Sequence, residues 1–327
     1  MASFSEIIGY NGIIDSLKSS ILSQRVSHAY IFDGQAGMGK TMLAKAFSKT
    51  VQCEAGGADA CGQCVSCRAF ESGNHPDVFY VSSDKKSIGV DDIREQVITP
   101  METRPYRYRY KVFIIGKADT MTTAAQNALL KTIEEPAPFG LFLLLSENYN
   151  AFLPTVISRC IIFRLKPLPE EDVIGYLSQR DISEEQARFY SAFSQGNIGK
   201  AMCLASSQAF TEMRETVISL AQALRRLDIP DLFSRFHIFE TYKDDIQELL
   251  DLFMLWYRDV IIMKETNSPS LLFQQDKKNE IYAEAQATDL SFLYKKFDAI
   301  WQAKRNLKQN GNFQLTLEMM LLSLGNG

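Results

Sequence analysis

The stretch GQAGMGKT at residues 34–41 constrains the fold of this chain more than any other part of the sequence. It satisfies the pattern G-x-x-x-x-G-K-[ST], and it follows an apolar run and precedes a helical segment, which is the context that a phosphate-binding loop requires. Its glycines let successive backbone N–H groups converge on phosphate oxygens at the start of a helix. The loop therefore predicts an α/β domain that binds a nucleotide.

Every residue of this loop is a candidate nucleotide ligand. Lys40 can reach the β and γ phosphates, and Thr41 can bind Mg²⁺ through its hydroxyl. The full set is Gly34, Gln35, Ala36, Gly37, Met38, Gly39, Lys40 and Thr41. Two alternatives stay open at this point: a glycine-rich turn that only caps a helix, and a loop retained for structure that never hydrolyses nucleotide.

Short apolar runs rich in Val, Ile, Phe and Tyr recur through the first half of the chain. They occupy residues 28–33, 77–82, 111–116, 140–145 and 160–165, and helical segments lie between most of them, at residues 41–52, 90–99 and 121–135. Strands that alternate with helices predict right-handed crossovers and a mostly parallel sheet. We therefore predict a P-loop domain over residues 1–166.

Strand signals stop at the proline-rich segment KPLPEED, residues 166–172. Residues 167–206 are predicted to form a small helical lid of two or three short helices, broken at Gly196 and Gly199. Residues 207–327 read as helical throughout, which predicts an all-α domain. Its clearest amphipathic stretch is 244–265, where five large side chains fall on one face: Leu249, Leu250, Phe253, Trp256 and Tyr257.

Four cysteines crowd into residues 53–67, at Cys53, Cys61, Cys64 and Cys67. Two residues between thiolates let a tight turn aim both sulfurs at one tetrahedral ion, and four thiolates leave no position open for water. The segment is rich in glycine and poor in apolar residues, so it needs a metal to hold a shape. The spacing predicts a structural Zn²⁺ site, with redox-active or free cysteines as the alternative.

Three further residues could be mistaken for metal ligands, and we predict structural roles for them. His75 is expected to pack or cap a turn, because four thiolates make it unnecessary as a ligand. Cys160 and Cys203 stand alone in the sequence and are expected to be buried small hydrophobic residues.

Composition limits the class of protein. The formal net charge of −4 gives no general attraction for nucleic acid, so DNA contact would need a local basic patch or a partner's surface. There is no long uncharged apolar run and no signal-peptide pattern at the N-terminus, which predicts a cytoplasmic protein without a membrane partner.

Several separate stretches resemble the bacterial DNA polymerase III clamp-loader subunits: SHAYIFDGQAGMGKT, the four-cysteine segment, KVFIIGKADTMTTAAQNALLKTIEEP (111–136) and LPTVISRC (153–160). The resemblance implies an AAA+ fold: a five-stranded P-loop domain, a helical lid, and a C-terminal collar through which subunits assemble into a pentameric ring. It also implies gamma/tau and delta subunits as partners. The sliding clamp and primer-template DNA would be reached through the complex, which belongs to the DNA polymerase holoenzyme without being the polymerase.

The third apolar run lacks the acidic residues of a motor. In active subunits of the family this strand ends in Asp-Glu, and those side chains support Mg²⁺ and orient the attacking water. Here the aligned residues are Gly116 and Lys117, which can do neither. Asp119 lies further on and is expected to cap a helix. The resemblance therefore implies a subunit that binds ATP weakly or not at all and hydrolyses it poorly. An active gamma/tau-like motor is the alternative.

A P-loop nucleotide kinase is a third hypothesis, from another class of protein. A kinase needs arginines that grip phosphates from a mobile lid. The predicted lid contains only Arg180 and Arg188, which form no such cluster, so this hypothesis ranks last.

Two basic residues acquire roles from the resemblance. Arg159 of ISRC corresponds to an arginine finger that enters the nucleotide site of a neighbouring subunit and stabilises γ-phosphate charge during cleavage. A structural arginine that pairs within its own domain is the alternative. Lys200 of GNIGKA occupies the lid position where related ATPases have a phosphate-sensing arginine, and an exposed helical lysine explains it equally well.

The stretch RPYRYRYK at residues 104–111 interleaves four basic residues with three tyrosines. That pattern fits single-stranded nucleic-acid binding by stacking. Because it leads directly into the third strand, a solvated loop with its tyrosines packed on the domain is favoured. In the helix that follows Thr122 or Thr123, Ala125, Leu129 and Ile133 form a core face. Asn127 and Lys131 on this helix are candidates for DNA contact by resemblance.

Overall fold

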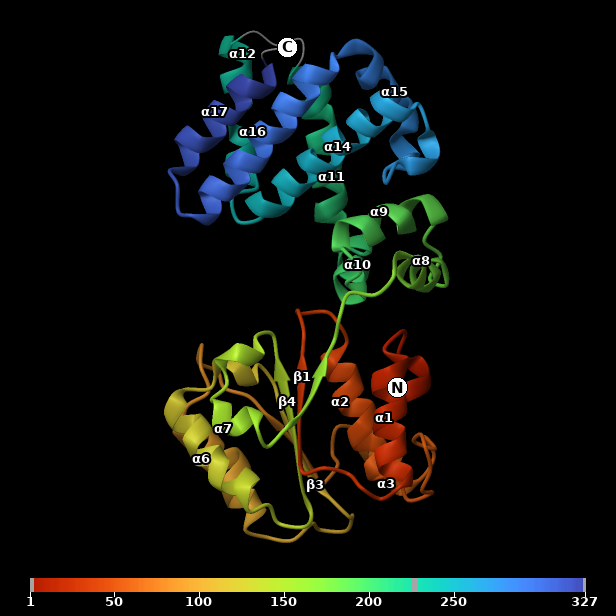
Figure 1. Ribbon diagram of the computed structural model, residues 1–327, viewed down its shortest axis with the longest axis vertical. Helices are drawn as coiled ribbons and strands as arrows, with labels where there is room; N and C mark the ends of the chain where they lie inside the picture. The colour runs from red at the N-terminus through yellow and green to blue at the C-terminus, as the bar shows by residue number, and fades with distance from the viewer. Residues whose placement is uncertain (1–2, 225–228, 326–327) are drawn as a thin grey trace. The chain divides into compact units, whose positions relative to one another are not determined.

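The computed structural model describes residues 3–224 and 229–325, and residues 1–2, 225–228 and 326–327 lie outside the described part. The chain divides into two compact units, Met1–Leu168 and Pro169–Gly327, which Figure 1 draws with a colour ramp along the chain. The division of the second part into a lid (167–206) and a collar (207–327) stays a prediction.

The first unit is built on a five-stranded parallel sheet, as the apolar runs predict. Each run matches one strand, and only β4 extends beyond its run, by one residue: β1 (Ala29–Asp33), β2 (Val78–Val81), β3 (Lys111–Ile115), β4 (Gly140–Ser146) and β5 (Ile161–Arg164). The strand order is β2-β3-β4-β1-β5, so β1 lies between β4 and β5. The order places the loop after β1 among the carboxyl ends of its neighbours, where open parallel sheets bind ligands.

Helices cover both faces of this sheet, with α1 and α2 on one side and α6 and α7 on the other (Figure 1). Along β1 the side chains alternate: Tyr30 and Phe32 pack in one core cluster, and Ala29 and Ile31 in the other. The helical elements of the unit are η1 (Phe4–Glu6), α1 (Asn11–Leu22), α2 (Lys40–Val51), α3 (Val65–Glu71), α4 (Val90–Ile93), η2 (Arg94–Ile98), α5 (Thr99–Met101), η3 (Ala118–Thr120), α6 (Thr123–Glu134), η4 (Tyr149–Ala151) and α7 (Pro154–Ile157).

Helix α6 forms the core face that its sequence predicts, because Ala125, Leu129 and Ile133 are all buried. It begins at Thr123, and the hydroxyl of Thr122 accepts a hydrogen bond from the backbone N–H of Ala125 at 3.2 Å. Asn127 and Lys131 lie on the exposed face one turn apart. Their proposed contact with DNA stays a prediction.

The second unit is helical throughout its described residues. Its elements are α8 (Glu170–Ser178), α9 (Glu184–Ser194), α10 (Ile198–Ala205), α11 (Gln208–Leu224), α12 (Ile229–Ser234), α13 (His237–Thr241), α14 (Ile246–Thr266), η5 (Pro269–Leu271), η6 (Gln275–Lys277), α15 (Lys278–Ala287), α16 (Leu290–Lys308) and α17 (Phe313–Gly325). Helix α14 packs against α11, α15 and α16. All five large side chains predicted on its inner face are fully buried.

One of the two helix breaks predicted near residue 197 is wrong. The chain leaves α9 through Gln195 and Gly196, whose φ angles of 53° and 79° lie in the left-handed region. Helix α10 then begins at Ile198, with the Asn197 side chain accepting a hydrogen bond from the Lys200 N–H at 3.0 Å. Gly199 lies inside α10, where this cap offsets the cost of about 1 kcal/mol for a helical glycine.

Within residues 3–224 and 229–325, no helix combines the length and the apolar character that crossing a bilayer requires.

Candidate functional site

The loop of residues 34–41 makes a tight turn from the carboxyl end of β1 into the first turn of α2. Gly39 has a φ of 86° immediately before the helix, a conformation that favours glycine. A Cβ atom on Gly34 would lie 3.0 Å from the carbonyl oxygen of Leu165, which is closer than such atoms normally approach. Met38 is buried beneath the loop and anchors it. The backbone therefore has the shape that the motif predicts.

The Lys40 side chain folds back on this loop. Its Nζ donates hydrogen bonds to the carbonyl oxygens of Gly34 at 2.5 Å and Gln35 at 2.9 Å. Burial lowers the pKa of Lys40, and the nearby carboxylates of Glu147, Asp119 and Asp33 oppose that shift. A phosphate oxygen could accept hydrogen bonds from this ammonium in place of the two carbonyls.

The carboxyl end of β3 presents no acidic pair to this loop. Gly116 follows the strand and donates its N–H to the Val81 carbonyl at 3.1 Å, and Lys117 is exposed with a left-handed φ of 48°. Asp119 lies in η3, and Thr122 is the residue that caps α6, so the predicted capping role of Asp119 is wrong. The helix begins later than that prediction requires. The Oδ1 atom of Asp119 is buried and has no hydrogen-bond partner among the described residues.

Arg159 follows α7 and precedes β5, with its guanidinium engaged inside its own unit. Nη2 lies 3.0 Å from Oε1 of Glu134, the last residue of α6. Nη1 donates to the Thr155 carbonyl at 2.9 Å and to Ser158 Oγ at 3.2 Å. The side chains of Arg159 and Glu134 are 37% and 43% exposed. A pair this exposed is worth at most about 1 kcal/mol, so the guanidinium can exchange Glu134 for another anion.

Lys200 lies in the second unit, and the 34–41 loop lies in the first. Its Nζ is 3.5 Å from Glu248 Oε1 on α14 and 5.1 Å from the centroid of the Phe193 ring. The ion pair agrees with the interpretation of Lys200 as a half-exposed helical lysine. Its role in phosphate sensing stays a prediction.

The four cysteines of residues 53–67 converge on one point. The Sγ atoms of Cys53, Cys61, Cys64 and Cys67 all lie within 4.8 Å of one another. Four thiolates around a tetrahedral Zn²⁺, with bonds of about 2.3 Å, need sulfurs about 3.8 Å apart. The Cys61 and Cys67 sulfurs lie 4.0 Å apart, so the donor set is compatible with such an ion. The cluster can therefore bind a metal.

Backbone N–H groups support the sulfurs of this cluster. The N–H groups of Cys61, Cys64 and Cys67 donate to the sulfurs of Cys53, Cys61 and Cys64, each at 3.4 Å. The backbone N–H groups of Gln63 and Cys64, with the neighbouring thiols of Cys53 and Cys64, lower the pKa of Cys61 to about 6. Hydrogen bonds of this kind favour the thiolate, which is the form that binds a metal.

His75 lies beside the cluster without belonging to it. Its Nε2 is 3.1 Å from Ser66 Oγ, its Nδ1 accepts the Asp77 N–H at 3.2 Å, and its ring packs against Phe70 and Tyr108. The structure thus confirms its predicted packing and turn role. Burial of the imidazole lowers the pKa of His75.

The two lone cysteines differ from each other. Cys160 is half-buried against one face of the sheet, and burial raises its pKa to about 12. Cys203 is exposed, so the prediction that it is buried is wrong. In α10 the buried positions are Ala201 and Leu204, and Cys203 lies on the opposite face.

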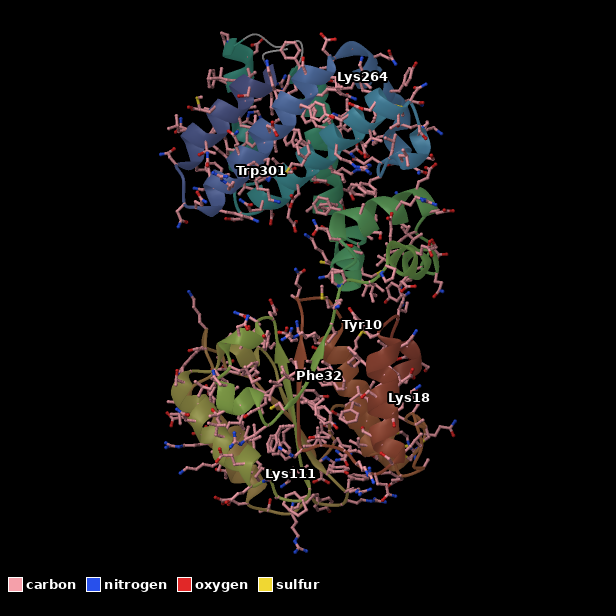
Figure 2. The ribbon with its side chains drawn as sticks, in the orientation of Figure 1. Tyr10, Lys18, Phe32, Lys111, Lys264 and Trp301 are labelled. Carbon is pink, nitrogen blue, oxygen red and sulfur yellow. The ribbon has the colours of Figure 1, made fainter. Side chains whose placement is uncertain are left out.

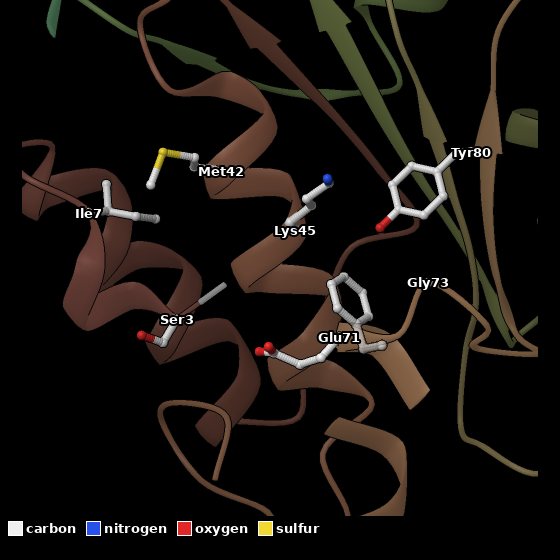
Figure 3. A pocket seen from close by; sticks show the side chains of 8 residues that line it. Ser3, Ile7, Met42, Lys45, Glu71, Gly73 and Tyr80 are labelled. Atoms are coloured by element: carbon white, nitrogen blue, oxygen red, sulfur yellow. The ribbon is translucent and has the colours of Figure 1, made fainter. Parts of the chain in front are cut away.

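A hollow of about 400 Å³ lies beside α2, away from the 34–41 loop. Figure 3 shows Met42 and Lys45 on α2 and Tyr80 on β2 among the side chains that line it. The lining residues are Ser3, Ile7, Met42, Lys45, Phe70, Glu71, Gly73 and Tyr80. No residue of the loop is among them, so this hollow is separate from the nucleotide loop.

Sequence reasoning missed three polar residues that position the candidate sites. Glu134 holds Arg159, and Asp77 accepts three backbone N–H groups of the 104–110 segment. Gln126 is buried in α6, donates to the carbonyls of Met121 and Ala151, and accepts the Leu153 N–H at 2.7 Å. It thereby joins the segment after β3 to the segment before Arg159. Of the three, only Gln126 could have been noticed in the sequence, because it is a polar residue next to the predicted core position Ala125.

Two family models match this chain. The model described as "DNA polymerase III, delta subunit" matches residues 9–169, and the one described as "DNA polymerase III, delta subunit, C terminal" matches residues 208–326. Together they span the first unit and most of the second.

Curated relatives agree with these models. The chain is 33% identical over 326 residues to the DNA polymerase III subunit delta′ of Bacillus subtilis, covering 96% of each chain. It is 24% identical over 345 residues to the tau subunit of the same organism, covering 98% of this chain and 61% of the relative. The tau/gamma subunit of Haemophilus influenzae is 35% identical over 176 residues, which are 54% of this chain and 25% of the relative.

Proposed function

This chain belongs to the family of bacterial DNA polymerase III delta′ subunits, which are related to clamp loaders, and we propose that it acts as the subunit that holds nucleotide poorly and does not cleave it. Its task in this proposal is to help a clamp loader place a sliding clamp on primed DNA during replication. The proposed partners are the gamma/tau and delta subunits in a pentameric ring, in the cytoplasm.

One observation supports the absence of turnover. The phosphate loop has its expected backbone, yet Gly116 and Lys117 stand at the strand end where a carboxylate pair supports Mg²⁺ and orients water. Phosphate cradling uses backbone N–H groups and Lys40, and these remain. Losing the group that positions water costs orders of magnitude in rate without removing the cradle.

Arg159 is the residue that we propose for catalysis, acting on ATP bound by a neighbouring subunit. Its guanidinium is partly exposed, and it is held by a single carboxylate and two neutral oxygens. A γ-phosphate carries more charge than Glu134 and can accept the planar fork in a bidentate way. Exchange of Glu134 for that phosphate would bring a cation to the transition state in trans.

The metal that we propose for the cysteine cluster is structural Zn²⁺. Four sulfurs within 4.8 Å, supported by backbone N–H groups, suit a closed tetrahedral site with no position for water. Zn²⁺ would supply cross-links in a segment that has few apolar contacts of its own. It would take no part in phosphate chemistry.

The test measures ATP turnover in two settings. The isolated chain should show almost no ATP turnover. In the reconstituted complex with gamma/tau and delta, Arg159→Ala should slow ATP cleavage about 10³-fold at the neighbouring site that Arg159 serves. Arg188→Ala is the matched control, because Arg188 is a similarly exposed arginine paired with Glu184 at 2.7 Å. An unchanged rate for Arg159→Ala would remove the finger assignment.

An active motor is the second candidate, and one observation favours it. The carboxylate of the half-buried Asp119 lies near enough to Lys40 to influence its pKa, so a carboxylate is present near the loop although it is displaced along the sequence. Robust turnover by the isolated chain, abolished by Asp119→Asn, would establish this candidate in place of the first.

A further inference from the structure

The loop of residues 104–110, called here the arginine–tyrosine loop, lies far from the nucleotide loop. It joins α5 to β3 and so lies at the amino ends of the parallel strands, whereas residues 34–41 follow the carboxyl end of β1. Figure 2 shows Lys111, the first residue of β3, at the opposite end of the first unit from Tyr10. Any ligand of the arginine–tyrosine loop is therefore distinct from a nucleotide at the phosphate loop.

A buried carboxylate fixes the backbone of this loop. Asp77 is fully buried, and its carboxylate accepts the N–H groups of Tyr106 at 2.6 Å, Arg107 at 3.1 Å and Tyr108 at 3.1 Å. The Lys111 ammonium also donates to the Thr103 carbonyl at 2.9 Å, just before the loop. Hydrogen bonds to a charged group are stronger than neutral ones, so the loop is held in one shape.

The three tyrosines of the loop have different environments. Tyr110 is buried, and the Tyr108 ring lies 4.6 Å from the His75 ring, as the packed-loop interpretation predicts. Tyr106 does not follow that prediction, because it is 84% exposed. Two tyrosines therefore pack inward while the third extends into solvent from a fixed backbone. A rigidly presented aromatic ring is the surface on which a nucleic-acid base stacks.

Arginines stand on both sides of Tyr106 in the sequence. Arg107 pairs with Glu54 at 3.1 Å, and its side chain is still 57% exposed. Arg104 and Arg109 form no ion pair within the part of the chain that the structure describes. The Arg109 guanidinium lies 5.3 Å from the Tyr110 ring, which holds it near the loop. Glu102 is the acidic residue nearest to the loop in the sequence, and the basic residues of 104–111 outnumber it. The loop therefore carries a net positive charge although the whole chain has a net charge of −4.

We propose that the arginine–tyrosine loop binds single-stranded DNA. Tyr106 stacks on an unpaired base, and Arg104 and Arg109 contact the flanking phosphates. The exposed ring is what favours a nucleic acid over an acidic protein surface, because arginines alone would suffice for acidic side chains. Duplex DNA is the poorer ligand, since its bases already stack on each other. This site depends on neither Arg159 nor the phosphate loop.

The experiment measures binding of fluorescein-labelled oligo(dT) to the 327-residue chain by fluorescence anisotropy. Tyr106→Ala should weaken binding about tenfold, and Tyr106→Phe should bind like the original chain, because the phenyl ring still stacks. Tyr282→Ala is the matched control, since Tyr282 is an exposed tyrosine on α15 at 47%. The double variant Arg104→Ala, Arg109→Ala should reduce the slope of log affinity against log salt by about 1.4.

Several outcomes would overturn this proposal. These are no binding of oligo(dT) by the original chain, equal affinity of Tyr106→Ala and the original, or equal loss in Tyr106→Ala and Tyr106→Phe. Displacement of the oligonucleotide by polyglutamate without any effect of Tyr106→Ala would assign the loop to an acidic protein partner instead. Unchanged thermal unfolding of the variants shows that they are folded. ATP turnover of the reconstituted complex is a separate measurement, so failure here leaves the proposed function to its own test.

Discussion

The two ends of helix α2 lead into two sites that are completed in different ways. At its N-terminus the phosphate loop supplies backbone donors and Lys40, but the acidic partners would have to come from the end of β3, about 75 residues further along the chain. Beyond its C-terminus all four cysteines come from residues 53–67 and meet within 4.8 Å. The cysteine cluster has all four of its sulfurs in one short segment, whereas the acidic partners of the phosphate loop would have to come from a distant strand.

The largest expected effect is the loss of the metal from the self-contained site. Cys64→Ser removes one thiolate, while the serine hydroxyl can still accept the N–H that caps α3. It should reduce bound zinc from about one equivalent to none after dialysis against a chelator. Cys203→Ser is the control, because Cys203 is exposed and outside the cluster. Metal analysis of both variants provides the measurement. Full zinc retention by Cys64→Ser would show that the site does not need all four ligands.

Thiol reactivity should separate the cluster from the lone cysteines. Burial raises the pKa of Cys160 to about 12, so at pH 8 only about 1 in 10⁴ of its thiols is ionised. Because the raised pKa keeps the thiol protonated, alkylation of Cys160 should stay slow and increase only as the pH approaches 12. Cys203 should react at pH 8, and the four clustered cysteines should react after the metal is removed. Mass spectrometry after iodoacetamide treatment identifies each site, and rapid labelling of Cys160 at pH 8 would contradict this expectation.

Carboxylates placed at the end of β3 should give the phosphate loop the acidic partners that it lacks. A Cβ atom at Gly116 would meet only the Val81 carbonyl, at 3.9 Å, so Gly116→Asp fits without strain. Combined with Lys117→Glu, it should raise ATP turnover of the isolated chain by about 10²-fold, since it returns a metal-supporting carboxylate and a water-orienting one. Gly116→Asn with Lys117→Gln has the same shape without charge and is the control. Equal rates for the two pairs would mean that the loop fails for another reason.

The smallest expected effect concerns nucleotide binding. Lys40→Ala should weaken ATP binding to the isolated chain about tenfold, because the ammonium contacts the β and γ phosphates while the backbone donors remain. Lys45→Ala is the matched control, because Lys45 is a lysine further along the same helix and outside the loop. Isothermal titration calorimetry measures both variants. Equal affinity in Lys40→Ala and the original chain would show that the loop does not bind ATP through this lysine.

The sequence predicts local features of this molecule well and non-local ones poorly. The five strands and the buried face of α14 follow from apolar patterns, and the cysteine cluster follows from spacing, because each depends on residues close together in the chain. The partner of Arg159 does not follow, since Glu134 reaches it only through the packing of α6 on α7. The exposed Cys203 was misjudged for the same reason: composition does not say which face of a short helix is covered.

The tyrosine-rich stretch shows a further limit of pattern reading. Its residue types agree equally with packing and with ligand binding, and the structure contains both behaviours in one loop. What separates Tyr106 from Tyr108 is the direction in which the backbone presents each side chain. The backbone at both positions is held by Asp77, a residue about 30 positions earlier that no local pattern connects to the loop.

The way in which Asp77 holds the loop also affects how this surface can change during evolution. Its carboxylate accepts main-chain N–H groups at positions 106, 107 and 108, so these three hydrogen bonds do not depend on which side chains stand there. Any residue except proline retains the N–H that Asp77 requires. Related proteins can therefore vary the exposed side chains at positions 106 and 107, and with them the ligand preference of this surface, at little cost in folding as long as the aspartate remains, whereas Tyr108 also packs against His75.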